Sequence, residues 1–452
     1  MFKNPFRNTR SLVAVLTQDR LLTEGVFTSA LCSPKNDVPK HILSENVAVF
    51  TDTDRTGLNN NVLVLGGPGT GKDRGLILPN LLEANGSYIV TDPSGALARQ
   101  TGSFFKSKGY DVKVLDLCDT AHSNHFNPFA YADDGESIVA MVDSLIFATH
   151  GSGKTGSDPF WEDTMRALLL ALVFYVKSFC PPSEQNLHQI AKMLHCPSAA
   201  GKPLSDLDPI FNEVREKYPD HICLKYYDIF RKADEATAGA VFAAAGEKTA
   251  MFESEPIAKL TAVDDLNLGS FNQKPTVLFI VIPQIVFGPL PIVSMVIAAA
   301  FAALYRSSDI CLRNTGKKPG YNVEFILNEF ANIGVIPSFE EKLSTMRRFC
   351  MSCWICLDSV TQLKNLYGKQ SDTIVGDCSA RIYLGSNDPE NVGFVKELVG
   401  KNVSPETRKM EYAMTEEEIS QMDSKNCIIC VDRHLPMMDR KFNRFREDST
   451  LL

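Results

Sequence analysis

A glycine-rich loop with a single lysine is the first feature of the sequence whose residue types and spacing could do chemistry. It directly follows the apolar residues 61–65 and has the spacing G-x-x-x-x-G-K. This spacing places backbone N–H groups around a polyphosphate at the N-terminus of a helix, where the lysine reaches the β- and γ-phosphates. The predicted nucleotide contacts are Gly66, Gly67, Pro68, Gly69, Thr70, Gly71, Lys72 and Asp73.

Position 73 departs from the usual pattern of such a loop, which has Ser or Thr there because its hydroxyl binds Mg²⁺. Asp73 instead places a carboxylate beside the phosphates. Two like charges about 4 Å apart repel by about 4 kcal/mol at an effective dielectric constant of about 20, unless a metal ion lies between them. We therefore predict that Asp73 is a metal ligand, and we expect weakened Mg²⁺ binding because the usual hydroxyl ligand is missing.

A second G-K-T sequence occurs at residues 153–155. The first glycine of the full pattern would fall on Ala148, and the residues before the loop are typical of a helix rather than a strand. We interpret this segment as a polar loop before a helix capped by Asp158.

A second motif, Asn328 followed by Glu329, comes directly after residues 323–327, which we expect to form a strand. A nucleoside triphosphatase has Asp-Glu there: the Asp holds Mg²⁺, and the Glu orients or deprotonates the attacking water. We predict that Glu329 is catalytic and that Asn328 shares the metal with Asp73. The carboxylate has moved from position 328 to position 73, which leaves the formal charge unchanged. This exchange either preserves metal binding or is a coincidence in a decaying site.

The elements that must position these residues alternate between strands and helices. Strands are expected at residues 47–51, 61–65, 87–91, 112–117, 276–282, 323–327, 353–357, 380–384 and 427–431. Between residues 133 and 262 nearly all signals are helical, at 160–179, 185–194 and 232–251. The sequence predicts an α/β fold whose parallel sheet is flanked by helices, with an all-α insertion. The expected divisions are an N-terminal arm (1–45), the first part of the core (46–132), the insertion (133–262) and the second part of the core (263–452).

Composition limits the classes of protein that fit. The 452 residues are 44% hydrophobic and 22% charged, as in ordinary globular proteins, which argues against disordered, collagen-like or coiled-coil chains. The net charge of −8 provides no overall field that attracts DNA, so any contact with DNA needs a local basic patch. Twelve cysteines are too few for a disulfide scaffold and favour a reduced, cytoplasmic location. The apolar residues 291–305 are too few for a bilayer, which needs about 20, and predict a core helix rather than a transmembrane segment.

Several segments, in order along the chain, resemble a known family. They are LGGPGTGKDRGLILPN (residues 65–80), YIVTDPSG (88–95), NPF (127–129), SDPFWE (157–162), FILNEFANIGVIP (325–337) and QLKNLY (362–367). These resemble the coupling proteins of conjugative type IV secretion, the TraG/TraD-like ATPases. The resemblance implies a RecA-like P-loop core with an inserted all-α domain, which uses ATP and Mg²⁺. It also implies a hexameric ring at the inner face of the cytoplasmic membrane that passes relaxase-bound DNA to the secretion channel.

The residues that depart from the family pattern are those that carry chemistry. The family motif T-D-P-K-G-E has Ser94 and Ala96 in place of its lysine and its acid. A glutamine that senses the γ-phosphate is replaced by Asp358, which would repel that phosphate because a carboxylate only accepts hydrogen bonds. The transmembrane pair that the family usually has at its N-terminus is also not found in the sequence.

Arg347 aligns best with a family arginine that acts on the phosphate of a neighbouring subunit, although a solvated cation at a helix end explains it equally well. Cys350, Cys353 and Cys356 are spaced by three on a predicted strand, so they point to alternate faces and are expected to be core residues rather than metal ligands. The basic residues between 432 and 446 are interpreted as a solvated edge, with contact to DNA or a partner as the alternative.

Two functions remain open at this point. The first is a coupling-protein-like ring component with weak hydrolysis that engages DNA or a relaxase–DNA complex and contacts the channel proteins. The second is a non-catalytic paralogue that binds or regulates, alone or in a mixed ring with an intact relative. An unrelated cytosolic P-loop enzyme is a third, weaker interpretation.

Overall fold

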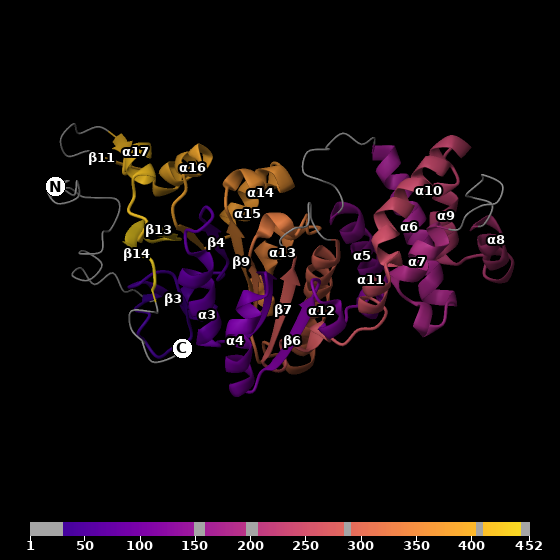
Figure 1. Ribbon diagram of the computed structural model, residues 1–452, viewed down its shortest axis with the longest axis horizontal. Coiled ribbons are helices and arrows are strands. Elements are labelled where there is room, and N and C mark those ends of the chain that lie inside the picture. Colours follow the sequence, from indigo (N-terminus) through magenta and orange to yellow (C-terminus); the bar gives the residue numbers. More distant parts are fainter. Residues whose placement is uncertain (1–29, 149–158, 196–206, 284–290, 404–409, 444–452) are drawn as a thin grey trace. The chain divides into compact units, whose positions relative to one another are not determined.

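The computed structural model describes residues 30–148, 159–195, 207–283, 291–403 and 410–443 (Figure 1). The chain divides into two compact units. Unit 1 comprises residues 1–86, 324–330 and 343–452, and unit 2 comprises residues 87–323 and 331–342. The G-K-T sequence at residues 153–155, the Asp158 cap and residues 444–446 of the basic tail lie outside the described residues.

Unit 1 is built on strands in the order β14-β13-β10-β4-β9-β8. Their bounds are β4 (Val62–Leu65), β8 (Val323–Leu327), β9 (Met351–Leu357), β10 (Ala380–Tyr383), β13 (Asn426–Val431) and β14 (Met437–Arg440). β4 runs parallel to β9 and β10, while β13 is antiparallel to β10 and β14. β4 is a continuous apolar run, and β8 is apolar apart from Glu324, as expected of strands that are buried on both faces.

The remaining elements of unit 1 are short. The helices are α2 (Thr53–Thr56), η2 (Asp73–Ile77), α3 (Leu78–Glu83), η10 (Met346–Phe349), α14 (Val360–Tyr367), α15 (Gln370–Gly376), α16 (Pro389–Val399) and α17 (Glu416–Ser420), and α13 (Phe339–Thr345) spans the division between the units. A small antiparallel sheet has the order β1-β3-β2, with β1 (Leu31–Cys32), β2 (Lys40–Ile42) and β3 (Ala48–Phe50). A two-stranded sheet joins β11 (Lys401–Val403) and β12 (Met410–Tyr412).

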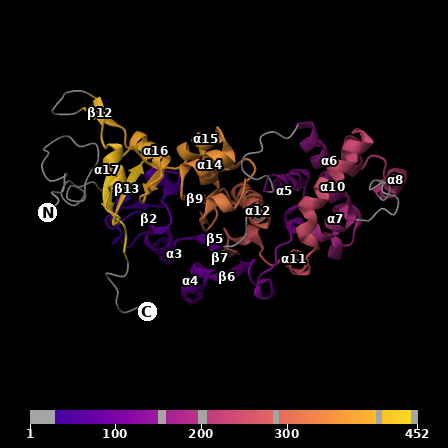
Figure 2. The same ribbon diagram turned by 45° about the horizontal axis from the view of Figure 1, so that its top comes forward.

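Unit 2 contains three parallel strands in the order β5-β7-β6, which are β5 (Ser87–Pro93), β6 (Asp111–Asp116) and β7 (Thr276–Ile282). Its helices are α4 (Ala96–Ser107), α5 (Gly135–Ala148), α6 (Pro159–Phe179), α7 (Leu187–Leu194), α8 (Leu207–Lys217), α9 (Ile222–Phe230), α10 (Glu235–Thr249), α11 (Glu255–Leu260) and α12 (Pro291–Thr315). Every described element between residues 133 and 262 is helical, and α6 packs against α9 and α10. Figure 2 shows α6 and α10 side by side. The predicted α/β class with a helical insertion is therefore confirmed, whereas its exact boundaries stay a prediction.

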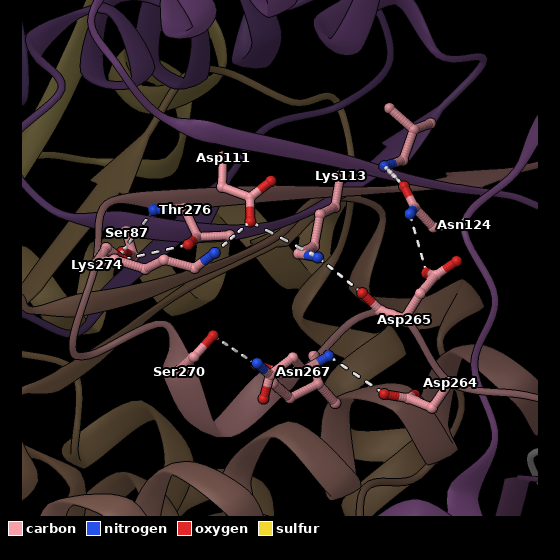
Figure 3. A network of polar contacts seen from close by, with 12 residues as sticks. Ser87, Asp111, Lys113, Asn124, Asp264, Asp265, Asn267, Ser270, Lys274 and Thr276 are labelled. Atoms are coloured by element: carbon pink, nitrogen blue, oxygen red, sulfur yellow. Dashed lines mark hydrogen bonds and ion pairs between the residues drawn. The ribbon is translucent and has the colours of Figure 1, made fainter.

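A polar network ties the edge of the unit 2 sheet to the segment that returns from the helical insertion (Figure 3). The ammonium of Lys274 binds Asp111 at 2.6 Å, and that of Lys113 donates to the carbonyl oxygen of Asp265 at 2.7 Å. The Asp265 carboxylate in turn accepts from Asn124 at 2.9 Å. Because these contacts join β6 to the start of β7 and to residue 265, the insertion enters and leaves at a fixed edge of the sheet.

Helix α12 is, in the described part of the chain, the one helix long and apolar enough to cross a membrane by length and composition. Its side chains are nevertheless engaged within unit 2. Ser294 Oγ donates to the carbonyl of Val335 at 2.9 Å, and the Tyr305 hydroxyl donates to that of Lys342 at 2.9 Å. Ile292, Val293 and Phe301 are buried. These contacts agree with the core helix predicted from residues 291–305.

A buried polar cluster crosses the core of unit 1. The Glu324 carboxylate on β8 accepts from the indole Nε1 of Trp354 on β9 at 2.6 Å and lies 2.7 Å from the Nε2 of His41 on β2. The rings of His41 and Trp354 meet edge to face, 5.4 Å apart. All three side chains are almost fully buried, so each depends on the others for its hydrogen bonds.

Replacing Glu324 with Leu should lower the free energy of unfolding by roughly 2–6 kcal/mol, because two buried donors lose their acceptor at about 1–3 kcal/mol each. Urea unfolding followed by Trp354 fluorescence in a Trp161→Phe background measures this loss. The control Glu324→Gln keeps an acceptor oxygen and should lose less than half as much. Equal stability of Glu324→Leu and its parent would show that the cluster contributes nothing.

Candidate nucleotide-binding site

The register of the unit 1 sheet brings the ends of its central strands together. Leu65, the last residue of β4, pairs with Leu357 on β9 and with Tyr383 on β10. The loop that follows β4 is held between these neighbours, because the Gly66 N–H donates to the carbonyl of Leu357 and the Gly67 N–H to that of Gly385, both at 3.1 Å. The phosphate loop therefore lies at the carboxyl edge of the sheet, where α/β proteins bind ligands.

Three glycines are required by the backbone conformation of the loop. Gly69 and Gly71 have φ values of 74° and 94°, in the left-handed region that favours glycine. At Gly66 a Cβ atom would come within 2.9 Å of the Leu384 Cβ. The Thr70 hydroxyl donates to the carbonyl of Gly67 at 2.7 Å and closes the turn. The glycine spacing in the sequence thus has a steric cause at each of the three positions.

Lys72 is held by two acceptors. Its ammonium donates to the carbonyl of Gly66 at 2.7 Å and forms an ion pair with the Asp358 carboxylate. Only 8% of the lysine side chain and 27% of the aspartate side chain are exposed. The Asp358 backbone is fixed as well, since its N–H donates to Gln362 at 3.1 Å and its carbonyl accepts from Asn391 at 2.7 Å. The Asp358 carboxylate is therefore bound to the same ammonium that would bind a phosphate in a phosphate loop.

The residues predicted to exchange a carboxylate are in direct contact. The Asn328 Nδ2 donates to Asp73 Oδ1 at 2.9 Å, and the Asn328 Oδ1 accepts the Glu329 N–H at 3.1 Å. Asn328 is buried, whereas Asp73 is exposed. Among the described residues, no group of three or more His, Cys, Asp or Glu side chains could hold a metal ion. Because Mg²⁺ beside phosphates takes only one or two protein carboxylates, Asp73 still fits that role.

Glu329 lies beside these charges. Burial of its carboxyl raises its pKa above the ordinary glutamate value, and the charge of Asp358 raises it further, while Lys72 acts in the opposite direction. Its backbone adopts a φ of 52°, an unusual value for a residue other than glycine and one that is often found at functional positions. A carboxylate with a raised pKa at this place fits a general base.

The helix after the loop begins with a π-helical turn, residues Asp73–Ile77. Pro79 follows in α3, and its ring would clash with the carbonyl of Gly75 in a regular α-helix. The wider turn avoids this clash. Such turns are frequent at functional sites. Asp73 is the first residue of this turn.

Arg347 makes intramolecular contacts in unit 1. Its guanidinium donates to the carbonyls of Thr53 at 2.6 Å and Gly57 at 3.0 Å, which fastens η10 to α2. The neighbouring Arg348 is exposed. The role of Arg347 toward a second subunit stays a prediction. Ser94 belongs to unit 2, where it follows Asp92, whose carboxylate accepts the Ala98 N–H at 2.8 Å in the first turn of α4.

Two further observations concern residues outside the predicted site. Cys353 and Cys356 are fully buried in β9, and burial raises the pKa of both thiols. Lys441, which we expected at a solvated edge, is half-buried and donates to the carbonyl of Thr70 at 2.9 Å. No local pattern in the sequence indicates this contact, because 371 residues separate its partners.

Comparison with known proteins places this geometry in a family. Residues 23–451 match the family model described as type IV secretory system conjugative DNA transfer. The conjugal transfer protein TraG of Rhizobium radiobacter is 23% identical over 347 residues, and the protein VirD4 of Agrobacterium fabrum is 19% identical over 414 residues. These matches cover 75% and 85% of this chain but only 52% and 58% of those proteins, so the chain spans about half the length of the curated relatives it matches.

Solved structures share the fold. The plasmid coupling protein TrwB, in complex with the ATP analogue ADPNP, superimposes with a TM-score of 0.70 at 15% identity, over 98% of this chain and 97% of that one. The same protein with ADP and Mg²⁺ gives a TM-score of 0.68 at 14% identity, over 96% and 94% of the two chains. The RecA-like P-loop fold with a helical domain is thereby confirmed. The chain belongs to the type IV secretion family of conjugative DNA-transfer coupling proteins.

Proposed function

We propose that this chain is a nucleotide-binding component of a conjugative DNA-transfer apparatus whose own hydrolysis is weak. The observation that carries the proposal is the arrangement at the end of β4. A glycine loop with left-handed Gly69 and Gly71 places Lys72 beside Asp358 and Glu329. It also places Asp73 beside Asn328. This is the position in which a P-loop protein binds the phosphates of a nucleoside triphosphate.

The proposed ligand is ATP with Mg²⁺. TrwB, which shares the fold, has been crystallised with ADPNP and with ADP and Mg²⁺, and this supports the choice. On this chain the backbone N–H groups of Gly69, Gly71, Lys72 and Asp73, together with the Lys72 ammonium, would hold the phosphates. Asp73 would hold the metal, with Asn328 bonded to it. When bound, Mg²⁺ neutralises charge on the β- and γ-phosphates. Its binding is expected to be weak because Asn328 is a weaker partner for the metal than the carboxylate that usually stands there.

Weak hydrolysis follows from the groups that surround Lys72. Glu329 can orient or deprotonate water, but Asp358 places negative charge where the phosphoryl group develops more of it during transfer. Loss of one stabilising group typically lowers the rate by about 10²–10³. Asp358 and Asn328 together therefore predict turnover near background for the isolated chain.

The wider role is proposed from family membership. The chain would form a homo-oligomeric, hexameric ring, or a mixed ring with an intact paralogue, at the cytoplasmic face of the membrane. There it would engage DNA or a relaxase–DNA complex and contact the type IV secretion channel. The altered positions around Lys72 favour a second candidate, a non-catalytic paralogue that regulates the apparatus. Measurable ATP binding without turnover, even with DNA present, supports the second candidate.

Binding should depend on Lys72 and be opposed by Asp358. We expect Lys72→Ala to weaken ATP binding at least tenfold, and Asp358→Asn to strengthen it roughly tenfold, about 1.4 kcal/mol, because the amide neither repels phosphate nor pairs with the ammonium. Isothermal titration calorimetry measures both. In a Lys72→Ala background Asp358→Asn should have a smaller effect. No ATP binding by the unmodified protein, or equal affinity of Lys72→Ala, would remove the nucleotide from the proposal.

Hydrolysis should return only when several positions revert together. The combination Asp73→Thr, Asn328→Asp and Asp358→Gln should raise ATPase activity by orders of magnitude, more than the single reversions multiplied. The reason is that residues 73 and 328 are in contact. The single change Asn328→Asp would place a second carboxylate against that of Asp73, and the two would repel each other. Steady-state phosphate release measures the rates, and adding Lys72→Ala to the combination is the inactive control. Robust DNA-stimulated hydrolysis by the unmodified protein would instead contradict weak catalysis.

The pH dependence should report Glu329 as the base. Its raised pKa means that the active carboxylate forms only at a pH above the ordinary glutamate range, so kcat/KM should fall on the acidic side. Asp358 contributes to this shift. The triple reversion, which lacks that charge, should therefore lose activity at a lower pH than the double variant Asp73→Thr, Asn328→Asp. Identical acidic limbs in the two variants would exclude Glu329 as the titrating group.

A further inference from the structure

A cavity of about 420 Å³ lies in unit 1 directly beside the phosphate loop. One wall consists of Gly71, which belongs to the loop, and of Arg74 and Gly75 in the helical turn that follows. The opposite wall is formed by Lys441 and Phe442, which continue the chain beyond β14. The volume is within the range of about 300–1,000 Å³ that is typical of small-molecule sites.

The wall beyond β14 is fixed to the loop by specific contacts. The Lys441 ammonium donates to the carbonyl of Thr70 at 2.9 Å, and the Lys441 N–H donates to the carbonyl of Lys425 at 2.8 Å. The carbonyl of Arg440 accepts the Glu45 N–H at 2.9 Å. A Cβ atom added to Gly75 would lie 3.5 Å from the carbonyl oxygen of Phe442, so the two walls approach each other closely at that point. The position of this wall is therefore fixed relative to the loop by hydrogen bonds.

The lining has the charge and the surface that a nucleotide needs. Four cations, Arg74, Lys425, Arg440 and Lys441, face a single acid, Glu45, although the whole chain carries −8. Lys441 is half-buried, and burial lowers the pKa of its ammonium. Phe442 offers the one aromatic ring of the lining. Aromatic rings stack on bases of every type. The cations attract the phosphates to which the nucleoside is attached.

We propose that this cavity receives the base and ribose of the nucleoside triphosphate, with Phe442 against the base. Lys441 is a positioning residue that ties this subsite to the loop through Thr70. The inference rests on the proposed function, because the cavity is continuous with the loop that would hold the phosphates. Phosphates in the loop leave the nucleoside to extend past Gly71, and the cavity begins at that residue. The close approach of Gly75 and Phe442 narrows the cavity on one side, which a groove for an extended nucleic-acid backbone would not need.

The experiment compares two ligands that differ only in the nucleoside. Titration calorimetry with ATP and with inorganic tripolyphosphate is run on the full chain and on Phe442→Ala. We expect Phe442→Ala to weaken ATP binding by about five- to a hundredfold and to leave tripolyphosphate binding within about twofold, as loss of one stacked base predicts. Leu435→Ala, an equally apolar truncation at an exposed position outside the cavity, should change neither affinity.

A second variant, with its substitution on the opposite wall, keeps the test valid if Phe442→Ala fails to fold. Gly75→Leu would fill the cavity from the helical side and should also weaken ATP binding while sparing tripolyphosphate. Equal ATP affinity in both variants, equal losses for both ligands, or loss of single-stranded DNA binding with unchanged ATP affinity would each overturn the subsite. If the unmodified protein binds neither ATP nor tripolyphosphate, the proposed function itself fails. If it binds both and Phe442 and Gly75 do not matter, only the subsite fails.

Discussion

The buried ammonium of Lys72 is the charge on which the site depends. A charge that is withdrawn from water is costly unless an opposite charge and hydrogen bonds compensate it. The carbonyl of Gly66 supplies one hydrogen bond, and Asp358 supplies the counter-charge. Both partners are available because β4 and β9 run parallel and end at the same level, at Leu65 and Leu357. The sheet register thus determines whether the lysine is stabilised, and Asp358 stabilises it without a nucleotide.

The same reasoning explains why the altered residues are mutually compatible. Asp73 has a carboxylate, which only accepts hydrogen bonds, at a position where phosphate loops usually have a hydroxyl. The Asn328 Nδ2 group donates a hydrogen bond to this carboxylate. Two carboxylates in this contact would repel, and two amides would carry no charge for a metal. One negative charge and one hydrogen bond are retained. The site has therefore changed chemically while the geometry of a phosphate loop has been kept.

Much of the fold could be predicted from the sequence, because its central strands are apolar on both faces. β7 and β8 occupy the predicted residues 276–282 and 323–327. The strands β1, β2 and β14 were not predicted, since two to four residues are too few to show a period. Asp73 in the loop and Asn328 after β8 were predicted to share a site, and they are in contact, while their roles stay a prediction. The ion pair of Lys72 with Asp358 and the contacts of Arg347 with α2 depend on tertiary packing, which local patterns do not encode.

Lys441 extends this dependence to the end of the described chain. Its ammonium reaches the carbonyl of Thr70, while the neighbouring backbone bonds to residues 45 and 425. The loop is therefore held between β9 on one side and the segment after β14 on the other, by groups that are hundreds of residues apart. A ligand that binds such a loop binds only the folded arrangement, and it stabilises that arrangement by mass action. A nucleotide bound as proposed would therefore stabilise unit 1, and the stability of its sheet edge would depend on nucleotide occupancy whether or not hydrolysis follows.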